Sequence, residues 1–339
     1  MAKSINNYRG KGVSQTLQEY PFVSVVVTVY NAERTIGKCL ESIMKLEYPE
    51  DKLEVLVIDD GSTDNSVDMI RKYPVRLLRK RNSGYPSAMN AGIRKSRGNI
   101  VVIVDSDIYI TREWLVKVLR EFDDSKVGIV EGYVATAPTK NFWAKLAGYE
   151  VEDRCTRIES KYMDYLSSTC TAYRKEIFDS VGFFDEGLRR NSDEDLSHRA
   201  FKYGWKLIFR KDVMCFHDWR SSFGSYFMQQ LYQGKYMVKI IRKAPSLLLG
   251  KRGQPAHLYV PIVLTFLLFL APLYFFLNCI WVLTLLLAGL IVYHIPVTIR
   301  ILNRHRDWAM LLFPIAINVR YVAWLMGFVA GIMTEIIQR

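Results

Sequence analysis

The feature that most restricts the fold of this chain is a long uncharged segment near its C-terminal end. His257 to Ile299 contains no Asp, Glu, Lys or Arg. An apolar run well beyond about 20 residues is typical of membrane-spanning helices rather than of core helices in soluble proteins. Pro272 and Asn278 interrupt the run. We therefore predict two short spans joined by a tight turn, over residues 258–277 and 279–299.

A second apolar stretch, from Trp308 to Ile337, predicts a third span over residues 315–337. Gly327 and Gly331 within it are spaced as GxxxG, a pattern that permits close packing of helices. Arg320 is costly in an apolar segment unless it faces phosphate headgroups or protein. We expect Arg320 near the cytoplasmic interface, against an anionic lipid.

Basic residues exceed acidic ones, and the net charge is +12. Such an excess fits nucleic acid or an anionic membrane surface, and the apolar segments favour the membrane over nucleic acid. Basic clusters precede the first predicted span and separate the second from the third. The positive-inside rule places both clusters in the cytoplasm, together with the domain that precedes them. The clusters consist of Lys235, Lys239, Arg242, Lys243, Lys251 and Arg252, and of Arg300, Arg304 and Arg306.

These patterns divide the chain into four segments. Residues 1–20 form an N-terminal extension without the apolar core of a signal peptide. Residues 21–225 have the mixed composition of a soluble α/β domain, and residues 226–256 form a basic membrane-proximal region. Residues 257–339 form the transmembrane region of an integral protein of the cell membrane. No pattern indicates an oligomeric state.

Strand and helix signals alternate in the first third of the chain. Valine-rich or apolar runs at Phe22–Tyr30, Leu53–Ile58, Val75–Arg79 and Ile100–Val104 predict strands. Apolar residues at helical spacing follow the first strand, from Glu33 to Leu46. Repeated β-α-β units with short connections predict a largely parallel sheet covered by helices.

Polar side chains gather where three of these strands end: "YNAE" from Tyr30, "DDGS" from Asp59 and "DSD" from Asp105. In parallel sheets, ligands bind beyond the carboxyl ends of the strands. Two carboxylates at alternating positions can present oxygens to a divalent cation and a sugar hydroxyl. Mg²⁺ or Mn²⁺ typically takes one or two carboxylates together with substrate phosphates. Capping of the next helix is the alternative for "DSD", but Thr111 is placed to fill that role.

The ordered motifs "VVVTVYNAE", "VIDDGSTDNS", "NSGYPSAMNAG", "VDSD" and "SDEDLSHRAFKYGW" resemble those of the family 2 glycosyltransferases. The resemblance covers roughly Pro21 to His217. It implies the GT-A fold, a Rossmann-like α/β domain with a mostly parallel sheet. It also implies a nucleotide-sugar donor, UDP- or GDP-linked, a divalent cation (Mg²⁺ or Mn²⁺), and inversion of the anomeric centre in one displacement.

The resemblance assigns roles at the donor end of the site. One of Asp59 and Asp60 would hydrogen-bond the base, and the other would form the turn. Asp105 would contact the ribose or the donor sugar. Asp107 would bind the metal, together with His217 after a short strand, since a neutral imidazole can ligate Mn²⁺. The remaining nucleotide-sugar contacts would be Tyr30, Asn31 and Glu33 at the nucleoside, and Asn82, Gly84 and Asn90 near the ribose and phosphate.

The motif "NSDEDLSHRAFKYGW" provides the acceptor end of the site. An inverting transfer to a hydroxyl needs a carboxylate that removes its proton as the new bond forms. The resemblance implies that Asp195 is this catalytic base and that Glu194 orients the acceptor. Asp193 is a good N-cap for the helix that starts here.

Two departures from the family pattern bear on the acceptor. The segment "SSTCTAYRK", Ser167–Lys175, contains no glycine where many relatives are glycine-rich. The Gln-x-x-Arg-Trp motif of processive synthases is missing after the acidic motif, which favours transfer of a single sugar. We expect a hexosyltransferase that acts on a hydroxyl of a lipid or lipid-linked acceptor. A polyprenyl-phosphate sugar synthase is the alternative, and a processive polysaccharide synthase or an inactive membrane scaffold fits the residues less well.

Overall fold

The computed structural model describes residues 20–243, 259–268 and 270–337. The predicted extension 1–20, except Tyr20, and the end of the predicted region 226–256 lie outside the described residues. Within them, one nine-stranded sheet has the order β3-β2-β1-β4-β8-β6-β9-β5, and β7 pairs with β9. The strands are β1 Val23–Val29, β2 Leu53–Asp59, β3 Arg76–Arg79, β4 Ile100–Asp105, β5 Ile108–Ile110, β6 Val127–Thr136, β7 Tyr162–Met163, β8 Cys170–Arg174 and β9 Lys206–His217.

The sheet is parallel where the sequence predicts β-α-β units. Strands β3, β2, β1 and β4 run parallel, whereas β8 is antiparallel to both β4 and β6. The four predicted strands match β1, β2, β3 and β4 to within one residue at each end, and the helix expected after the first strand is α1. The helices of the domain are α1 Ile36–Met44, α2 Ser66–Ile70, α3 Tyr85–Lys95, α4 Trp114–Leu119, α5 Phe142–Arg157, α6 Glu176–Val181 and α7 Ser192–Tyr203.

The buried valines of β1 explain why helices cover both faces of the sheet. Successive side chains of a strand point to opposite faces. Val25 and Val27 pack in one core cluster with Leu40 of α1. Val26 packs in the other with Met89 of α3. Both clusters are removed from water, so they hold the loops at the strand ends in place.

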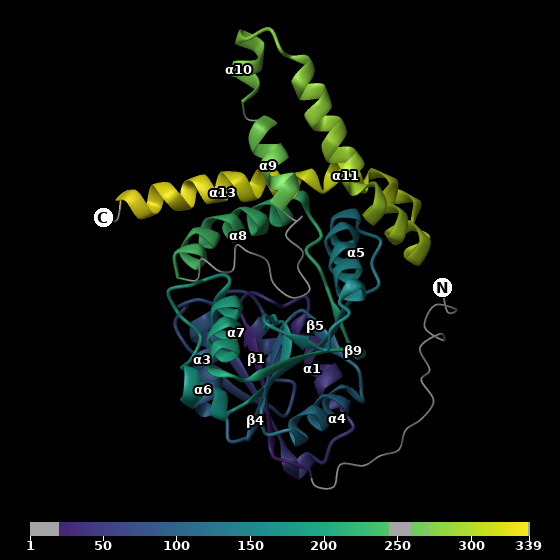
Figure 1. Cartoon of the computed structure of the whole chain (residues 1–339). Helices are drawn as coiled ribbons and strands as arrows, with labels where there is room; N and C mark the ends of the chain where they lie inside the picture. Colours follow the sequence, from purple (N-terminus) through teal and green to yellow (C-terminus); the bar gives the residue numbers. More distant parts are fainter. Residues whose placement is uncertain (1–19, 244–258, 269, 338–339) are drawn as a thin grey trace.

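The C-terminal helices lie on one side of the sheet domain (Figure 1). Helices α9, α10 and α11 form a hairpin that points away from the domain, and α13 crosses its base beside α8. The helix bounds are α8 Phe223–Lys243, α9 Tyr259–Leu268, α10 Ala271–Phe276, α11 Trp281–His305, α12 Phe313–Ala316 and α13 Asn318–Ile337.

Two helices in the described part of the chain are long and apolar enough to cross a membrane, Trp281–His305 and Trp308–Ile336. They cover two of the predicted spans, 279–299 and 315–337. The predicted span 258–277 is divided into α9 and α10, and neither piece alone has that length. The predicted domain boundaries at 225 and 256 stay predictions.

Helix α5 joins the sheet domain to the C-terminal helices. Arg300 at the end of α11 donates to Asp153 of α5, with Nε 2.6 Å from Oδ1. Lys145 of α5 forms an ion pair with Asp307 at 2.7 Å. Arg300, one of the basic residues that the sequence places beside the membrane, is therefore paired with an acid of the sheet domain.

Candidate active site

The ends of the parallel strands meet at one edge of the sheet and open into a cavity of about 1510 Å³. The strand register causes this meeting, because Thr28 pairs with Asp105 and Val29 pairs with Asp59. Loops that follow β1, β2 and β4 therefore start at the same level. The predicted site residues that line the cavity are Tyr30, Asn31, Glu33, Asp60, Asn82, Gly84, Asp105, Asp107, Glu194 and His217.

Asp107 and His217 lie together because a short antiparallel pairing joins their strands. Ile108 of β5 pairs with His217 of β9, and the N–H of Asp218 donates to the carbonyl of Asp107 at 2.9 Å. Asp107 Oδ2 lies 3.3 Å from His217 Nε2. The His217 ring also packs on Trp219, with centroids 3.9 Å apart. Two residues far apart in sequence thus present an oxygen and an imidazole nitrogen to one cavity.

The two acids of the "DSD" loop differ electrostatically. The Tyr85 hydroxyl donates to Asp105 Oδ1 at 2.6 Å. Burial, with the nearby Asp107 charge, raises the pKa of Asp105 to about 7. Burial alone would also raise the pKa of Asp107, but the adjacent His217 outweighs it and lowers that pKa. Asp107 is thus the carboxylate of the pair that stays ionised.

This donor set can hold part of a divalent cation site. In the described part of the chain, no three His, Cys, Asp or Glu side chains cluster tightly enough to hold a metal alone. Mg²⁺ and Mn²⁺ sites often use only one or two protein carboxylates, and substrate phosphates complete the coordination. Asp107 and His217, which face an open cavity, fit a cation site of this incomplete kind.

The paired acids of "DDGS" have separate roles. Asp59 is fully buried, accepts from the N–H of Ser62 at 3.0 Å and pairs with Arg79 at 3.1 Å. Asp60 lines the cavity, and Lys80 donates to it at 2.6 Å. Asp59 therefore forms the turn that the Asx pattern predicts. Asp60 is the acid of the pair that lines the cavity, and its two oxygens also accept from the N–H groups of Ser83 and Gly84.

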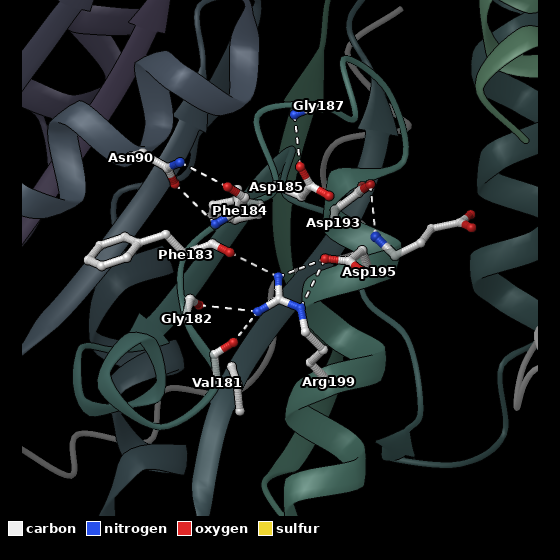
Figure 2. A network of polar contacts seen from close by, with 11 residues as sticks. Asn90, Val181, Gly182, Phe183, Phe184, Asp185, Gly187, Asp193, Asp195 and Arg199 are labelled. Atoms are coloured by element: carbon white, nitrogen blue, oxygen red, sulfur yellow. Dashed lines mark hydrogen bonds and ion pairs between the residues drawn. The ribbon is translucent and has the colours of Figure 1, made fainter. Parts of the chain in front are cut away.

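Asn90 does not reach the cavity, contrary to the sequence prediction. Its amide donates to the carbonyl of Phe184 at 2.9 Å and accepts from the N–H of the same residue at 3.0 Å (Figure 2). Asn90 is buried on the inner face of α3, well past Gly84, where the helix meets the loop before α7. Its role is to anchor that loop.

Asp195 is also turned away from the cavity. Nε and Nη2 of Arg199 donate to its Oδ2 at 2.9 and 2.7 Å, and the same guanidinium binds the carbonyl of Phe183 (Figure 2). Asp195 is not among the cavity-lining residues, whereas Asp193 and Glu194 are. Residues 193 and 195 differ by about 200° around a helix, so only one of the two can face the site.

The difference follows from where α7 begins. Asn191, in a left-handed conformation with φ of 61°, is the N-cap, and the helix starts at Ser192. Asp193 is consequently inside the first turn rather than its cap. The sequence contains all three acids but does not reveal the rotational phase of the helix that carries them.

Motif analysis missed several arginines on the cavity wall, among them Arg189, Arg190 and Arg220. Burial, followed by the charge of Arg190, lowers the pKa of Arg220, while Asp107 acts in the opposite sense. Two guanidinium groups that repel each other beside the "DSD" loop are suited to an anionic ligand between them. Tertiary structure brings these arginines to the cavity wall, so no local sequence pattern predicts their position there.

The end of the cavity nearest α13 contains a buried charge cluster. Arg320 of α13 donates to Glu150 of α5 at 3.1 Å, and Arg154 lies 3.1 Å from the other oxygen of Glu150. Burial would raise the pKa of Glu150, but Arg154 and Arg320 outweigh it and lower the pKa to about 2. Arg320 therefore faces protein rather than the anionic lipid expected from the sequence.

Glu131 of β6 is a further acid that motif analysis missed. It lines the cavity and accepts from the N–H of Ser167 at 2.9 Å and from the Ser167 hydroxyl. Burial raises its pKa to about 7, above the 4.5 of an ordinary glutamate. Ser167, in the segment that is glycine-rich in many relatives, thus holds the Glu131 carboxyl group inside the site.

We expect Glu131→Gln to flatten the pH dependence of stability between about pH 4.5 and 7. In the parent, the folded state retains a proton that the unfolded state releases, so stability falls as pH rises through this window and is constant above it. Over this window the free energy of unfolding of the parent falls by about 3 kcal/mol at most. Thermal unfolding in detergent at pH 5 to 8 measures it. The exposed Glu113→Gln serves as control, and parallel profiles for all three proteins would contradict the burial argument.

Comparison with known proteins identifies the chain. The family model for glycosyl transferase family 2 matches residues 24–182. Glycosyltransferase AglE of Haloferax volcanii is 30% identical over 228 residues, which are 65% of this chain and 74% of AglE. The chain belongs to glycosyltransferase family 2. The predicted resemblance is thereby confirmed.

Other similar proteins extend the comparison of this family 2 glycosyltransferase. A β-monoglucosyldiacylglycerol synthase of a Nostoc species is 34% identical over 134 residues, which are 37% of this chain and 29% of that protein. The mannosyltransferase PcManGT of Pyrobaculum calidifontis, solved with GDP-Man and Mn²⁺, superposes with a TM-score of 0.57 at 22% identity. That match covers 97% of this chain and 93% of the other. The predicted GT-A fold followed by C-terminal helices is confirmed.

Proposed function

We propose that this glycosyltransferase is a membrane-bound, inverting hexosyltransferase. It moves a single sugar from a UDP- or GDP-linked donor to a hydroxyl of a lipid or lipid-linked acceptor at the cytoplasmic face. One observation carries the proposal: a single cavity has the "DSD" loop at one end and residues of α8 and α13 at the other. Donor and lipid acceptor would meet between these ends. The name of one relative, β-monoglucosyldiacylglycerol synthase, supports a lipid acceptor.

At the donor end, Asp60 would bind the base, and Tyr30, Asn31 and Glu33 would surround the nucleoside. Arg190 and Arg220 would contact the diphosphate. Asp107 and His217 would hold Mn²⁺ or Mg²⁺, and the Mn²⁺ complex of PcManGT supports that choice. A bound cation offsets the negative charge that develops on the leaving diphosphate.

At the acceptor end, we assign the general base to Asp193 in place of Asp195. Asp193 would take the proton of the acceptor hydroxyl. As it does so, the hydroxyl oxygen would bond to the anomeric carbon of the donor sugar, and the bond between that carbon and the diphosphate would break. Glu194 beside Asp193 would orient the acceptor. Attack from the side opposite to the diphosphate inverts the anomeric centre.

The charges of this wall favour a hydroxyl over a phosphate acceptor. Asp193 and Glu194 both line it, and carboxylates repel a phosphate. Arg154 and Arg320 share one partner, Glu150, and so are already neutralised in part. A polyprenyl phosphate remains the alternative acceptor, and it would need no base because its oxygen is already ionised.

We expect a thermal shift with one class of nucleotide sugar in a panel of UDP- and GDP-linked hexoses. The shift should need Mn²⁺ or Mg²⁺ and should vanish with a chelator, because the phosphates complete the cation site. Release of free nucleoside diphosphate on addition of glycolipid or diacylglycerol acceptors then identifies the transfer. A protein that binds none of the donors with either cation would contradict the proposal.

A further inference from the structure

Helices α8 and α13 pack backbone against backbone. A Cβ on Gly234 of α8 would overlap the carbonyl of Trp324, and a Cβ on Gly327 of α13 would overlap the carbonyl of Leu231. Gly331, one turn further along α13, is equally close to α8. Such close approach to the backbone of the neighbouring helix is possible only because these three positions have no Cβ. The two helices therefore form one layer, and any placement of α13 in the membrane also places α8.

Helix α8 forms part of the catalytic cavity. Gln233 donates to Asn191, the N-cap of α7, at 3.2 Å. Trp324 of α13 donates to Gln230 of α8 at 2.9 Å, and both side chains line the cavity. A water-accessible site that admits a nucleotide cannot lie at the depth of the hydrocarbon core. The α8–α13 layer must therefore lie at the same depth relative to the membrane as the site, outside the hydrocarbon core.

The charged side chains of the α8–α13 layer also indicate that it lies outside the hydrocarbon core. Lys235, Lys239 and Arg242 are carried by the half of α8 that packs along α13, and Arg242 forms an ion pair with Glu335 near the end of α13. A membrane-spanning α13 would bring these groups into the hydrocarbon region, where charged side chains are rare and costly. The apolar composition of α13 is therefore not evidence of a span.

The face of α13 away from α8 is apolar and exposed. Met326, Val329, Met333 and Ile336 are 45%, 52%, 56% and 62% exposed. Their spacing of three or four residues places them on one stripe of the helix. Figure 1 shows α13 across the base of the α9–α11 hairpin rather than alongside it. The exposed apolar side chains of α11, such as Ile291 at its middle, continue beyond this base.

We infer that α13 does not cross the membrane but lies along its surface, with its apolar stripe in the lipid and α8 on the aqueous side. The lipid that covers the apolar stripe belongs to the same bilayer that the α9–α11 hairpin enters. The C-terminal end of α13 is then on the same side as the sheet domain. Three spans would place it on the opposite side. The inference rests on the proposed nucleotide site in this cavity, but not on which sugar or acceptor reacts there.

The native Cys279 in the turn of the hairpin gives the test an internal reference. The full chain with a short epitope after Arg339 is produced in sealed vesicles whose sheet domain faces outward, which protease digestion of that domain verifies. We expect external protease to remove the epitope. We expect an impermeant maleimide to label Cys279 only after the vesicles are permeabilised, with Cys279→Ser as the control for other thiols.

Two results would overturn the inference. An epitope protected until permeabilisation, on the same side as Cys279, would show that α13 crosses the membrane. Labelling of Cys279 in sealed vesicles would show that the hairpin does not cross it. Neither result depends on catalytic activity, so a wrong donor or acceptor assignment leaves the test valid.

Discussion

Asp193→Asn is expected to lower sugar transfer by about 10²–10⁴-fold, the usual contribution of a positioned general base. Asp193 faces the cavity from the first turn of α7, and asparagine keeps its shape but cannot accept the proton. Donor and cation binding should stay unchanged, since Asp107, His217 and Asp60 are untouched. Transfer to a hydroxyl acceptor, measured beside the affinity for the nucleoside diphosphate, separates the two effects.

Asp195→Asn is the matched control because it is the same change two residues away. It removes the charge that holds Arg199 and should cost about 1–3 kcal/mol of stability. Transfer per folded molecule should remain close to that of the parent. If Asp195→Asn abolishes transfer in a folded protein while Asp193→Asn does not, the base is Asp195 after all. If neither change matters, the acceptor is a polyprenyl phosphate.

Asp107→Asn is expected to abolish the Mn²⁺-dependent part of nucleoside diphosphate binding. Loss of an outer-shell partner alone costs about 10–100-fold in metal affinity, so loss of the charged ligand should cost at least as much. Calorimetry with the nucleoside diphosphate, with and without Mn²⁺, measures this. The weaker, metal-independent binding through Asp60 and the arginines should survive.

His217→Ala tests the second ligand under the same conditions. It removes the imidazole but leaves Asp107, so a partial loss of Mn²⁺-dependent binding is expected. If the variant binds like the parent, His217 is a structural residue that packs on Trp219, and only Asp107 anchors the cation. Asp59→Asn is an additional control, because that buried acid lies outside the cavity.

The donor half of the site could be predicted from sequence because parallel strands leave little freedom. Once β1, β2 and β4 are in register, Asp60 and Asp105 must emerge at the same edge. The family resemblance also implies Asp107 and His217 as partners, and the β5–β9 pairing brings them within 3.3 Å. Here local pattern and global fold agree.

The acceptor half could not be predicted because it depends on tertiary contacts. Asp193 and Asp195 are indistinguishable until the start of α7 is known, and that start depends on the conformation of Asn191. Arg320 and Glu150 are separated by 170 positions along the chain. Hydropathy likewise reports how apolar α13 is, but the direction of the helix is decided by its packing on α8.

The ion pairs along α5 have a consequence for which acceptors can react. Arg300 and Lys145 bind the sheet domain to the C-terminal helices, and Arg320 binds α13 to the same helix, α5. In the proposed reaction, the general base Asp193 is thereby held at a constant height above the lipid surface. Acceptors with a longer or shorter headgroup would present their hydroxyl at the wrong level. The distance from lipid to hydroxyl, measured along the membrane normal, thus becomes a criterion of selection beside the chemistry of the sugar.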